Sequence, residues 1–177
     1  MKKRILKTAA IGSALMVGIP FLSIFVMGTG PETFQIGEVI GYSTIFIAMG
    51  LIFFAIRSFR DEENGGLLRF GEGMKIGTAI SALGGMAFGL YNLLYVLVID
   101  PDFTEKYLAY SSGLEAGSPQ IAEKVAEMKE AYGFWMTVEG QTVTMFMTVF
   151  LIGFIITVIS SLILQNKKTQ NLETSLA

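Results

Sequence analysis

The sequence lacks two residue types that carry much of protein chemistry. Its 177 residues include no cysteine and no histidine. This excludes disulfides, thiol nucleophiles, His-based catalytic triads and the usual zinc sites. Charged residues make up only 16% of the chain and the formal net charge is -2, so nothing indicates a nucleic-acid partner. We therefore predict no metal site, no cofactor and no catalytic residues, and we expect that the protein is not an enzyme.

Long hydrophobic runs are what the sequence has in abundance. Hydrophobic residues make up 52% of the chain, and the mean hydropathy of +0.57 is rare for a soluble domain of this length. Four runs are long enough to cross a hydrocarbon core of about 30 Å as helices. They span about residues 5–27, 38–56, 76–99 and 143–164. The predicted fold is an all-α membrane protein, a four-transmembrane-helix bundle that forms one domain over 1–164, followed by a polar cytoplasmic tail, 165–177.

The first run allows two interpretations. Four basic residues precede the apolar stretch 8–27, and a cleaved signal peptide starts in the same way. The apolar core of a signal peptide is usually about 7–15 residues long and ends at a small-x-small site. This stretch has 20 residues and ends in VMGTGPE, which lacks such a site. We favour a retained transmembrane helix over a signal peptide.

The third run carries a stripe of small residues. No charged residue occurs between Ile76 and Ile99, and small residues recur at every fourth position, with Asn92 further along the same face. Small residues allow a second helix to approach closely, and a polar residue beside them needs a partner within the protein. We predict helix packing through this stripe, within one chain rather than between two copies. Its members are Gly77, Ser81, Gly85 and Gly89.

A longer polar segment, residues 100–137, separates the third and fourth runs. Asp102 with Glu105 is typical of a capping box and predicts a first short amphipathic helix. Ser118 followed by proline predicts the start of a second. The apolar face of the first helix would carry Phe103, Tyr107, Tyr110 and Leu114.

Basic residues predict the orientation. With four crossings, both termini and the connection between the second and third helices share one side of the membrane. That side holds ten of the 13 Lys and Arg residues and the other side holds three. Because basic residues favour the cytoplasmic side, we predict cytoplasmic termini and an extracytoplasmic segment 100–137.

Several short motifs occur in an order that resembles a known family. They are Glu38-Val-Ile-Gly-Tyr42, Phe53-Phe-Ala-Ile-Arg57-Ser-Phe-Arg60-Asp61, Gly66, Phe70, Lys75-x-Gly77, Asp100-Pro-Asp102-Phe103 and Glu127-Met128. Together they resemble the bacterial membrane family catalogued as domain of unknown function 4199, over nearly the whole chain. The resemblance implies a four-helix integral protein, which we expect in the bacterial cytoplasmic (inner) membrane. It supplies no activity, substrate or catalytic residue.

Two groups of polar residues are candidate sites. The first would lie in the extracytoplasmic half of the bundle and line a polar pocket; its members are Glu38, Tyr42, Tyr91, Asn92, Tyr95 and Glu139. The alternative, which we favour from the sequence alone, is interhelical hydrogen bonding beside an interfacial aromatic belt. The second group, Arg57 and Arg60, is either a contact for anionic lipid headgroups or a cytoplasmic topology anchor, and we favour the anchor.

Three classes of function remain open. We prefer an integral membrane protein that acts through membrane assembly or partner interaction, with a second copy of itself or another membrane protein in the lipid bilayer. The alternative is a small oligomeric transporter or channel for an unidentified solute. A lipid-modifying membrane enzyme is the third reading, and it has the least support because no residue spacing singles out a catalytic group.

Overall fold

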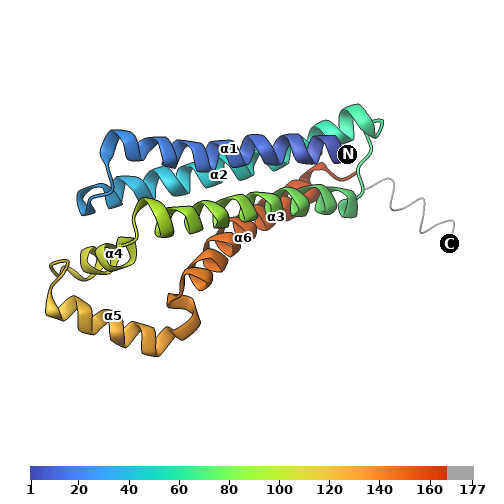
Figure 1. Ribbon diagram of the computed structural model, residues 1–177. Coiled ribbons are helices and arrows are strands. Elements are labelled where there is room, and N and C mark those ends of the chain that lie inside the picture. The colour runs from blue at the N-terminus through green and yellow to red at the C-terminus, as the bar shows by residue number, and fades with distance from the viewer. Residues whose placement is uncertain (167–177) are drawn as a thin grey trace.

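The computed structural model describes residues 1–166, and the described chain is helical without strands. The described chain forms six α-helices joined by short turns (Figure 1). They are α1 (Lys2–Met27), α2 (Phe34–Ser58), α3 (Phe70–Leu94), α4 (Phe103–Ser112), α5 (Pro119–Tyr132) and α6 (Val138–Leu164). Of the predicted polar tail, residues 167–177 lie outside the described part of the chain.

Four of these helices, α1, α2, α3 and α6, are long and apolar enough to cross a membrane. The predicted class, an α-helical bundle with four transmembrane helices, is therefore confirmed. The helices extend further than the apolar runs: α2 begins at Phe34 and continues through a π-helical turn, Phe59–Glu63, while α3 begins at Phe70. The difference arises because hydropathy marks only the lipid-immersed part of a helix, and the backbone hydrogen bonds continue into the polar border.

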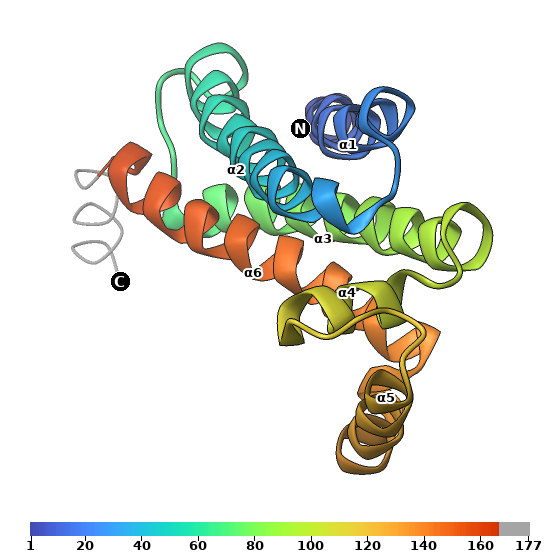
Figure 2. The ribbon, with the colours of Figure 1, turned by 90° about the vertical axis from the view of Figure 1, so that its left-hand side faces the viewer.

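The spanning helices form two layers. Both α1 and α2 lie on one side, with α3 and α6 on the other, as the view from the α4–α5 end shows (Figure 2). The N-terminus, the end of α6 and the α2–α3 connection lie together at the opposite end (Figure 1). We call residues 1–16, 46–87 and 149–166 the terminal half of the molecule. Residues 17–45 and 88–148, which include α4 and α5, form the cap half.

The terminal half contains the core. Around Gly84 of α3 all four spanning helices meet: a Cβ atom at this position would lie 3.0 Å from the methyl carbons of Met16 and Met49, and 3.7 Å from Val149. Met16, Met49 and Val149 are almost completely buried. Such close packing of side chains is the main attraction between helices inside a bilayer, where lipid tails are as apolar as the side chains.

The pair α3 and α6 forms the most extensive interface in the described chain. The predicted small stripe faces α6 of the same chain: Gly77 lies against Thr157, and Ser81 lies against Gly153. A Cβ atom at Gly85 would lie 2.9 Å from the backbone oxygen of Phe146. The stripe thus allows the two helices to approach with almost no side-chain layer between them.

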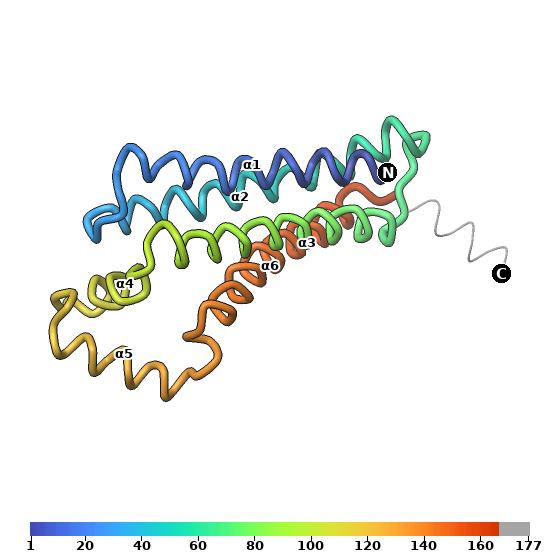
Figure 3. The backbone as a smooth tube through the Cα atoms, viewed as in Figure 1, coloured from blue at the N-terminus to red at the C-terminus, as the bar shows by residue number. Residues whose placement is uncertain are grey.

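The cap half continues from α3 into the two short helices. After α4, helix α5 runs back to the start of α6 through a 3₁₀ turn, Gly133–Met136 (Figure 3). The predicted start of α5 is confirmed, since Ser118 Oγ accepts a hydrogen bond from the Ile121 N–H at 3.3 Å.

The capping box predicted at Asp102 is wrong. Its side chain caps no N–H group, because its backbone, with ψ of 4°, does not have the extended conformation that an N-cap residue needs. Glu105 instead accepts a hydrogen bond from the Gly117 N–H at 3.0 Å. The carboxylate therefore ties α4 to the turn before α5 rather than to its own N-terminus.

Candidate functional site

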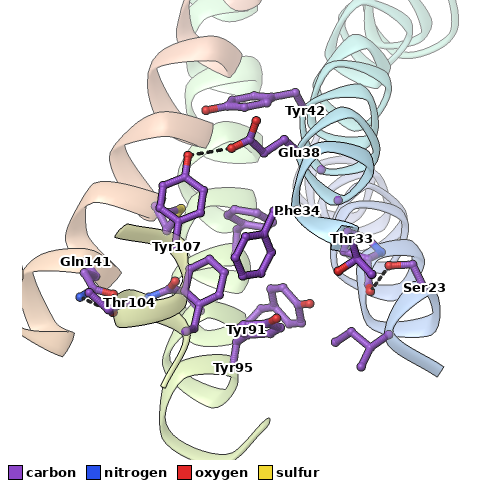
Figure 4. Close-up of a pocket in the computed structure, with 18 of the residues that line it drawn as sticks. Ser23, Thr33, Phe34, Glu38, Tyr42, Tyr91, Tyr95, Thr104, Tyr107 and Gln141 are labelled. Atoms are coloured by element: carbon purple, nitrogen blue, oxygen red, sulfur yellow. Dashed lines mark hydrogen bonds between the residues drawn. The ribbon is translucent and has the colours of Figure 1, made fainter. Parts of the chain in front are cut away.

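A pocket of about 520 Å³ lies in the cap half of the bundle. Residues of α1, α2, α3, α4 and α6 line it, together with residues of the turns between them. Figure 4 shows side chains from these elements converging on the cavity. Its volume falls in the range of sites that hold small molecules.

Aromatic rings form much of the pocket wall. Phe34, buried at the start of α2, lies 5.7 Å from the ring of Phe103 and 5.9 Å from that of Tyr107, centroid to centroid. Phe103 also contacts Tyr95 in an edge-to-face arrangement at 5.2 Å, and Tyr95 lies 6.1 Å from Tyr91. Rings at these separations attract one another and present wide apolar surfaces. The wall is therefore suited to a flat or chain-like apolar molecule.

Helix α4 is held over the pocket by contacts to two other helices. The Tyr107 hydroxyl donates to Glu38 Oε1 of α2 at 2.7 Å (Figure 4). The Gln141 Nε2 group of α6 donates to Thr104 Oγ1 at 3.2 Å. These bonds, together with the Phe34 ring contacts, fix α4 across one side of the cavity.

The turn between α3 and α4 contains a buried carboxylate that is paired with a partly exposed lysine. Asp100 is 3% exposed, and its Oδ1 atom accepts a bond from Lys106 Nζ at 2.6 Å. Asp100 directly follows a π-helical turn, Tyr95–Ile99, and Lys106 lies in the first half of α4. The pair therefore sets the direction in which α4 leaves α3.

The Tyr107–Glu38 bond affects the acidity of the phenol. The hydrogen bond that Tyr107 donates to the Glu38 carboxylate raises the pKa of Tyr107 to about 12, and partial burial acts in the same direction. Tyr107 therefore remains a neutral donor at every physiological pH. The bond that holds α4 does not switch in that range.

Among the described residues that line the pocket, Asn92 carries a buried side-chain atom without a hydrogen-bond partner. Its side chain is 8% exposed, and its Nδ2 atom is buried without a hydrogen-bond partner. A buried donor left unpaired costs about 1–3 kcal/mol, and such groups are rare in native proteins. Asn92 lies in the last turn of α3, directly before the π-helical turn, a feature that is frequent at functional sites.

Most hydroxyl groups of the pocket are already engaged. The hydroxyls of Thr144 and Thr148 donate to carbonyls one turn back in α6, at 2.9 Å each. Ser23 and Thr33 likewise donate to nearby backbone oxygens at 2.7 Å. Because their protons are committed to the backbone, these residues can offer a ligand only an acceptor oxygen. Asn92 is thus distinct from them.

The structure brings five of the six predicted pocket residues together. Glu38, Tyr42, Tyr91, Asn92 and Tyr95 all line the cavity. Glu139 is exposed in the first turn of α6 and is not among the lining residues. Two residues further on, a rotation of about 200° around the helix brings Gln141 to the cavity.

Sequence reasoning did not assign Phe34, Phe103 or Tyr107 to this site. A signal for two of them existed, since Phe103 and Tyr107 share the predicted apolar face of α4. An aromatic face on a short helix next to a candidate pocket was the available clue. Nothing local to Phe34 or Gln141 indicated that α4 would pack against them.

The predicted basic anchors lie at the other end of the molecule. Arg60 forms an ion pair with Asp61, with Nε and Oδ1 2.6 Å apart, and its Nη1 reaches the Leu164 carbonyl at 3.5 Å. Arg57 pairs with Asp61 at 3.6 Å and is more than half exposed. Arg60 thus joins the end of α2 to the end of α6, far along the helices from the pocket.

These features define the class of the protein: an α-helical, multi-pass membrane protein with an aromatic pocket at one end of its bundle. The chain belongs to the family described as "Protein of unknown function (DUF4199)", whose pattern matches residues 8–166. The match covers all four spanning helices and confirms the resemblance found in the sequence. No curated protein and no solved structure matches the chain.

Proposed function

We propose that this membrane protein acts by binding a small, largely apolar molecule in the cap-half pocket, without transforming it. The observation that carries the proposal is an aromatic cavity of about 520 Å³ containing a buried, unpaired donor at Asn92. Ligand sites typically combine a mostly apolar lining with a few polar groups that fix orientation. The preference drawn from sequence alone, assembly or partner contacts, therefore becomes the second candidate.

One surface supports that second candidate. Tyr132 at the end of α5 and Phe134 and Trp135 in the following turn are each more than half exposed. Exposed aromatic residues of this kind suit a membrane partner, and they also suit the polar border of the bilayer. Ligand binding and a partner contact at this surface are compatible, because the surface lies outside the pocket.

The close packing of the terminal half favours binding over the conduction of a solute through a single copy of the protein. Below the pocket, Gly84 is in contact distance of Met16, Met49 and Val149 from the three other spanning helices. A solute crossing the bundle would have to separate this packed layer. A transporter would therefore require a path between copies, which makes transport the weaker alternative.

Catalysis has less support than binding. Among the described residues that line the pocket, Glu38 is the one that carries a charge, and its carboxylate accepts a hydrogen bond from the Tyr107 hydroxyl. General acid–base chemistry usually needs a second positioned group.

We also propose that the protein resides in the bacterial cytoplasmic membrane with its terminal half towards the cytoplasm. The N-terminus, the α2–α3 connection and the end of α6 share one end of the bundle, and this end carries most of the basic residues. In this orientation the pocket lies in the outer half of the membrane and α5 lies outside. Reaction of single cysteines at Lys3 and Lys129 with a membrane-impermeant reagent tests it.

The pocket can be filled without disturbing the helix that carries it. Gly41 of α2 lines the cavity, and a Cβ atom there would meet nothing within 4 Å. Gly50 of the same helix is equally unobstructed but does not line the cavity. Gly41→Phe therefore occludes the pocket, and Gly50→Phe is its matched control.

Native mass spectrometry of the protein released gently from its own membrane tests the proposal. We expect a small bound molecule on the wild type and on Gly50→Phe, and its loss from Gly41→Phe. Equal retention by all three proteins would place the molecule elsewhere. Absence of any bound molecule from the wild type would contradict the proposed function.

A further inference from the structure

The chemistry of the pocket wall narrows the class of ligand. The pocket wall contains aromatic rings and the side chain of Asn92, whose Nδ2 group has no hydrogen-bond partner. This group is a donor and requires an acceptor. The hydroxyls of Thr144 and Thr148 donate to backbone oxygens of α6, and no side chain of the described lining accepts the Asn92 N–H. An acceptor carried by a bound molecule would satisfy this donor.

We propose that the ligand is an uncharged, carbonyl-bearing apolar molecule, and that Asn92 Nδ2 donates a hydrogen bond to its carbonyl oxygen. This inference rests on the proposed function and adds the chemical group that the site recognises. A carbonyl oxygen accepts a bond while adding no net charge, so it enters an apolar cavity at lower cost than a carboxylate. Asn92 is then the residue that sets the position of the ligand along the pocket.

The charge of the lining argues against an anionic ligand. The lining residues all belong to the described part of the chain, and among them there is no Lys or Arg, whereas Glu38 contributes a carboxylate. Within a low-dielectric cavity one carboxylate repels another strongly. A free fatty acid or a phosphorylated headgroup would meet this repulsion without a compensating cation.

Two sources offer the required chemistry. One is a quinone, whose ring carries carbonyl oxygens and can stack against Phe34, Tyr91 and Tyr95. The other is an uncharged acylglycerol, whose ester carbonyl follows an apolar chain. Both share the uncharged carbonyl acceptor, and separate probes distinguish them.

Matched probes isolate the carbonyl group. Menadione and methylnaphthalene share a fused ring system and differ in the two carbonyl oxygens. Monoolein and oleate share an oleoyl chain and differ in the head group, an uncharged glycerol ester in the first and a carboxylate in the second. Dissociation constants are measured by titration calorimetry on the full chain in uncharged detergent micelles, with empty micelles as the blank. The proteins are the wild type, Asn92→Leu, and Thr148→Val, which alters a lining hydroxyl already bonded to the backbone.

We expect at least one of menadione and monoolein to bind the wild type. Asn92→Leu should weaken that binding about 3- to 10-fold, the range expected for one net hydrogen bond. Binding of methylnaphthalene should change by less than about twofold, which also shows that the pocket of the variant is intact. Thr148→Val should leave all four probes unaffected. Monoolein should bind about tenfold more tightly than oleate, because of Glu38.

The outcomes separate the two levels of the proposal. If only the binding of menadione depends on Asn92, the ligand is of the quinone type. If only the binding of monoolein depends on Asn92, the ligand is an acyl ester. Asn92→Leu could also weaken the binding of methylnaphthalene as much as the binding of menadione. In that case the role assigned to Asn92 is wrong, while the proposed binding function stands. Tighter binding of oleate than of monoolein would contradict the proposal that the ligand is uncharged. If no probe binds and the wild type carries no molecule from its membrane, the proposed function itself fails.

Discussion

The two halves of the bundle use the same four helices in opposite ways. In the terminal half, helix α1 buries Ala9, Gly12 and Met16, whereas beyond Met16 it buries no further residue. Helix α6 shows the same change: no residue of the stretch 141–148 is buried, although burial resumes at Val149. The terminal half closes on itself, and the cap half leaves a cavity that aromatic rings and α4 surround.

Glycine shows what this difference means physically. In the terminal half Gly77 lies directly against Thr157 of α6, whereas Gly41 in the cap half faces the pocket with free space around it. At Gly77 the absence of a side chain allows two helices to approach closely. At Gly41 it leaves free space in the pocket. Under the proposed function, stability and binding would thus reside in different halves and could be changed separately.

The largest expected effect on the free energy of unfolding comes from replacing a glycine with leucine, once in each half. Gly77→Leu should lower the free energy of unfolding by about 3 kcal/mol, because its side chain would overlap with Thr157 and force α3 from α6. Gly41→Leu should leave the stability within about 1 kcal/mol, since nothing obstructs the side chain. Equilibrium unfolding in mixed micelles measures both. Equal losses would show that the cap half is packed as tightly as the terminal half.

A smaller loss of stability should follow from breaking the ion pair in the turn between α3 and α4. Lys106→Met leaves the Asp100 carboxylate buried without its cation and should cost about 2 kcal/mol. The double variant Asp100→Asn with Lys106→Met removes the charge as well, and most of the loss should be recovered. The same unfolding assay compares the two proteins. A double variant as unstable as Lys106→Met would mean that packing by the lysine stem, rather than charge, holds the turn.

The smallest effect concerns the bond between Tyr107 and Glu38. Because the carboxylate accepts from the neutral phenol, the pKa of Tyr107 is about 12, against an ordinary value near 10. A raised pKa means that the contribution of this bond is complete below about pH 10 and is lost as the pH rises through 12. Glu38→Gln should return the pKa of Tyr107 towards 10.

Absorbance of the phenolate reports this titration. Subtracting the curve of Tyr107→Phe from that of the parent protein, with and without Glu38→Gln, isolates one of the six tyrosines. An unchanged midpoint in Glu38→Gln would assign the shift to burial rather than to the bond. Hydrogen exchange in α4 of the same variants shows whether the bond also limits opening of the pocket.

The local patterns of the sequence determined the spanning helices and the face on which α3 packs. Residues at every fourth position share one side of a helix, so Gly77, Ser81 and Gly85 had to form a stripe in any helical structure. The absence of charge between Ile76 and Ile99 predicted a membrane-spanning helix. The start of α5 at Ser118 followed from a local bond to the Ile121 N–H. Each of these depends on neighbours a few residues apart.

The tertiary structure alone decided what surrounds the pocket. Glu38 and Tyr107 are 69 positions apart, and no local pattern relates them. Whether α4 folds over α2, and so brings Phe103 and Tyr107 to Phe34, depends on the direction of the chain after Asp100. The unpaired state of Asn92 is equally invisible in the sequence, because it depends on every atom that could have reached Nδ2. Helices follow from short-range periodicity, whereas a cavity is what remains once distant segments have packed.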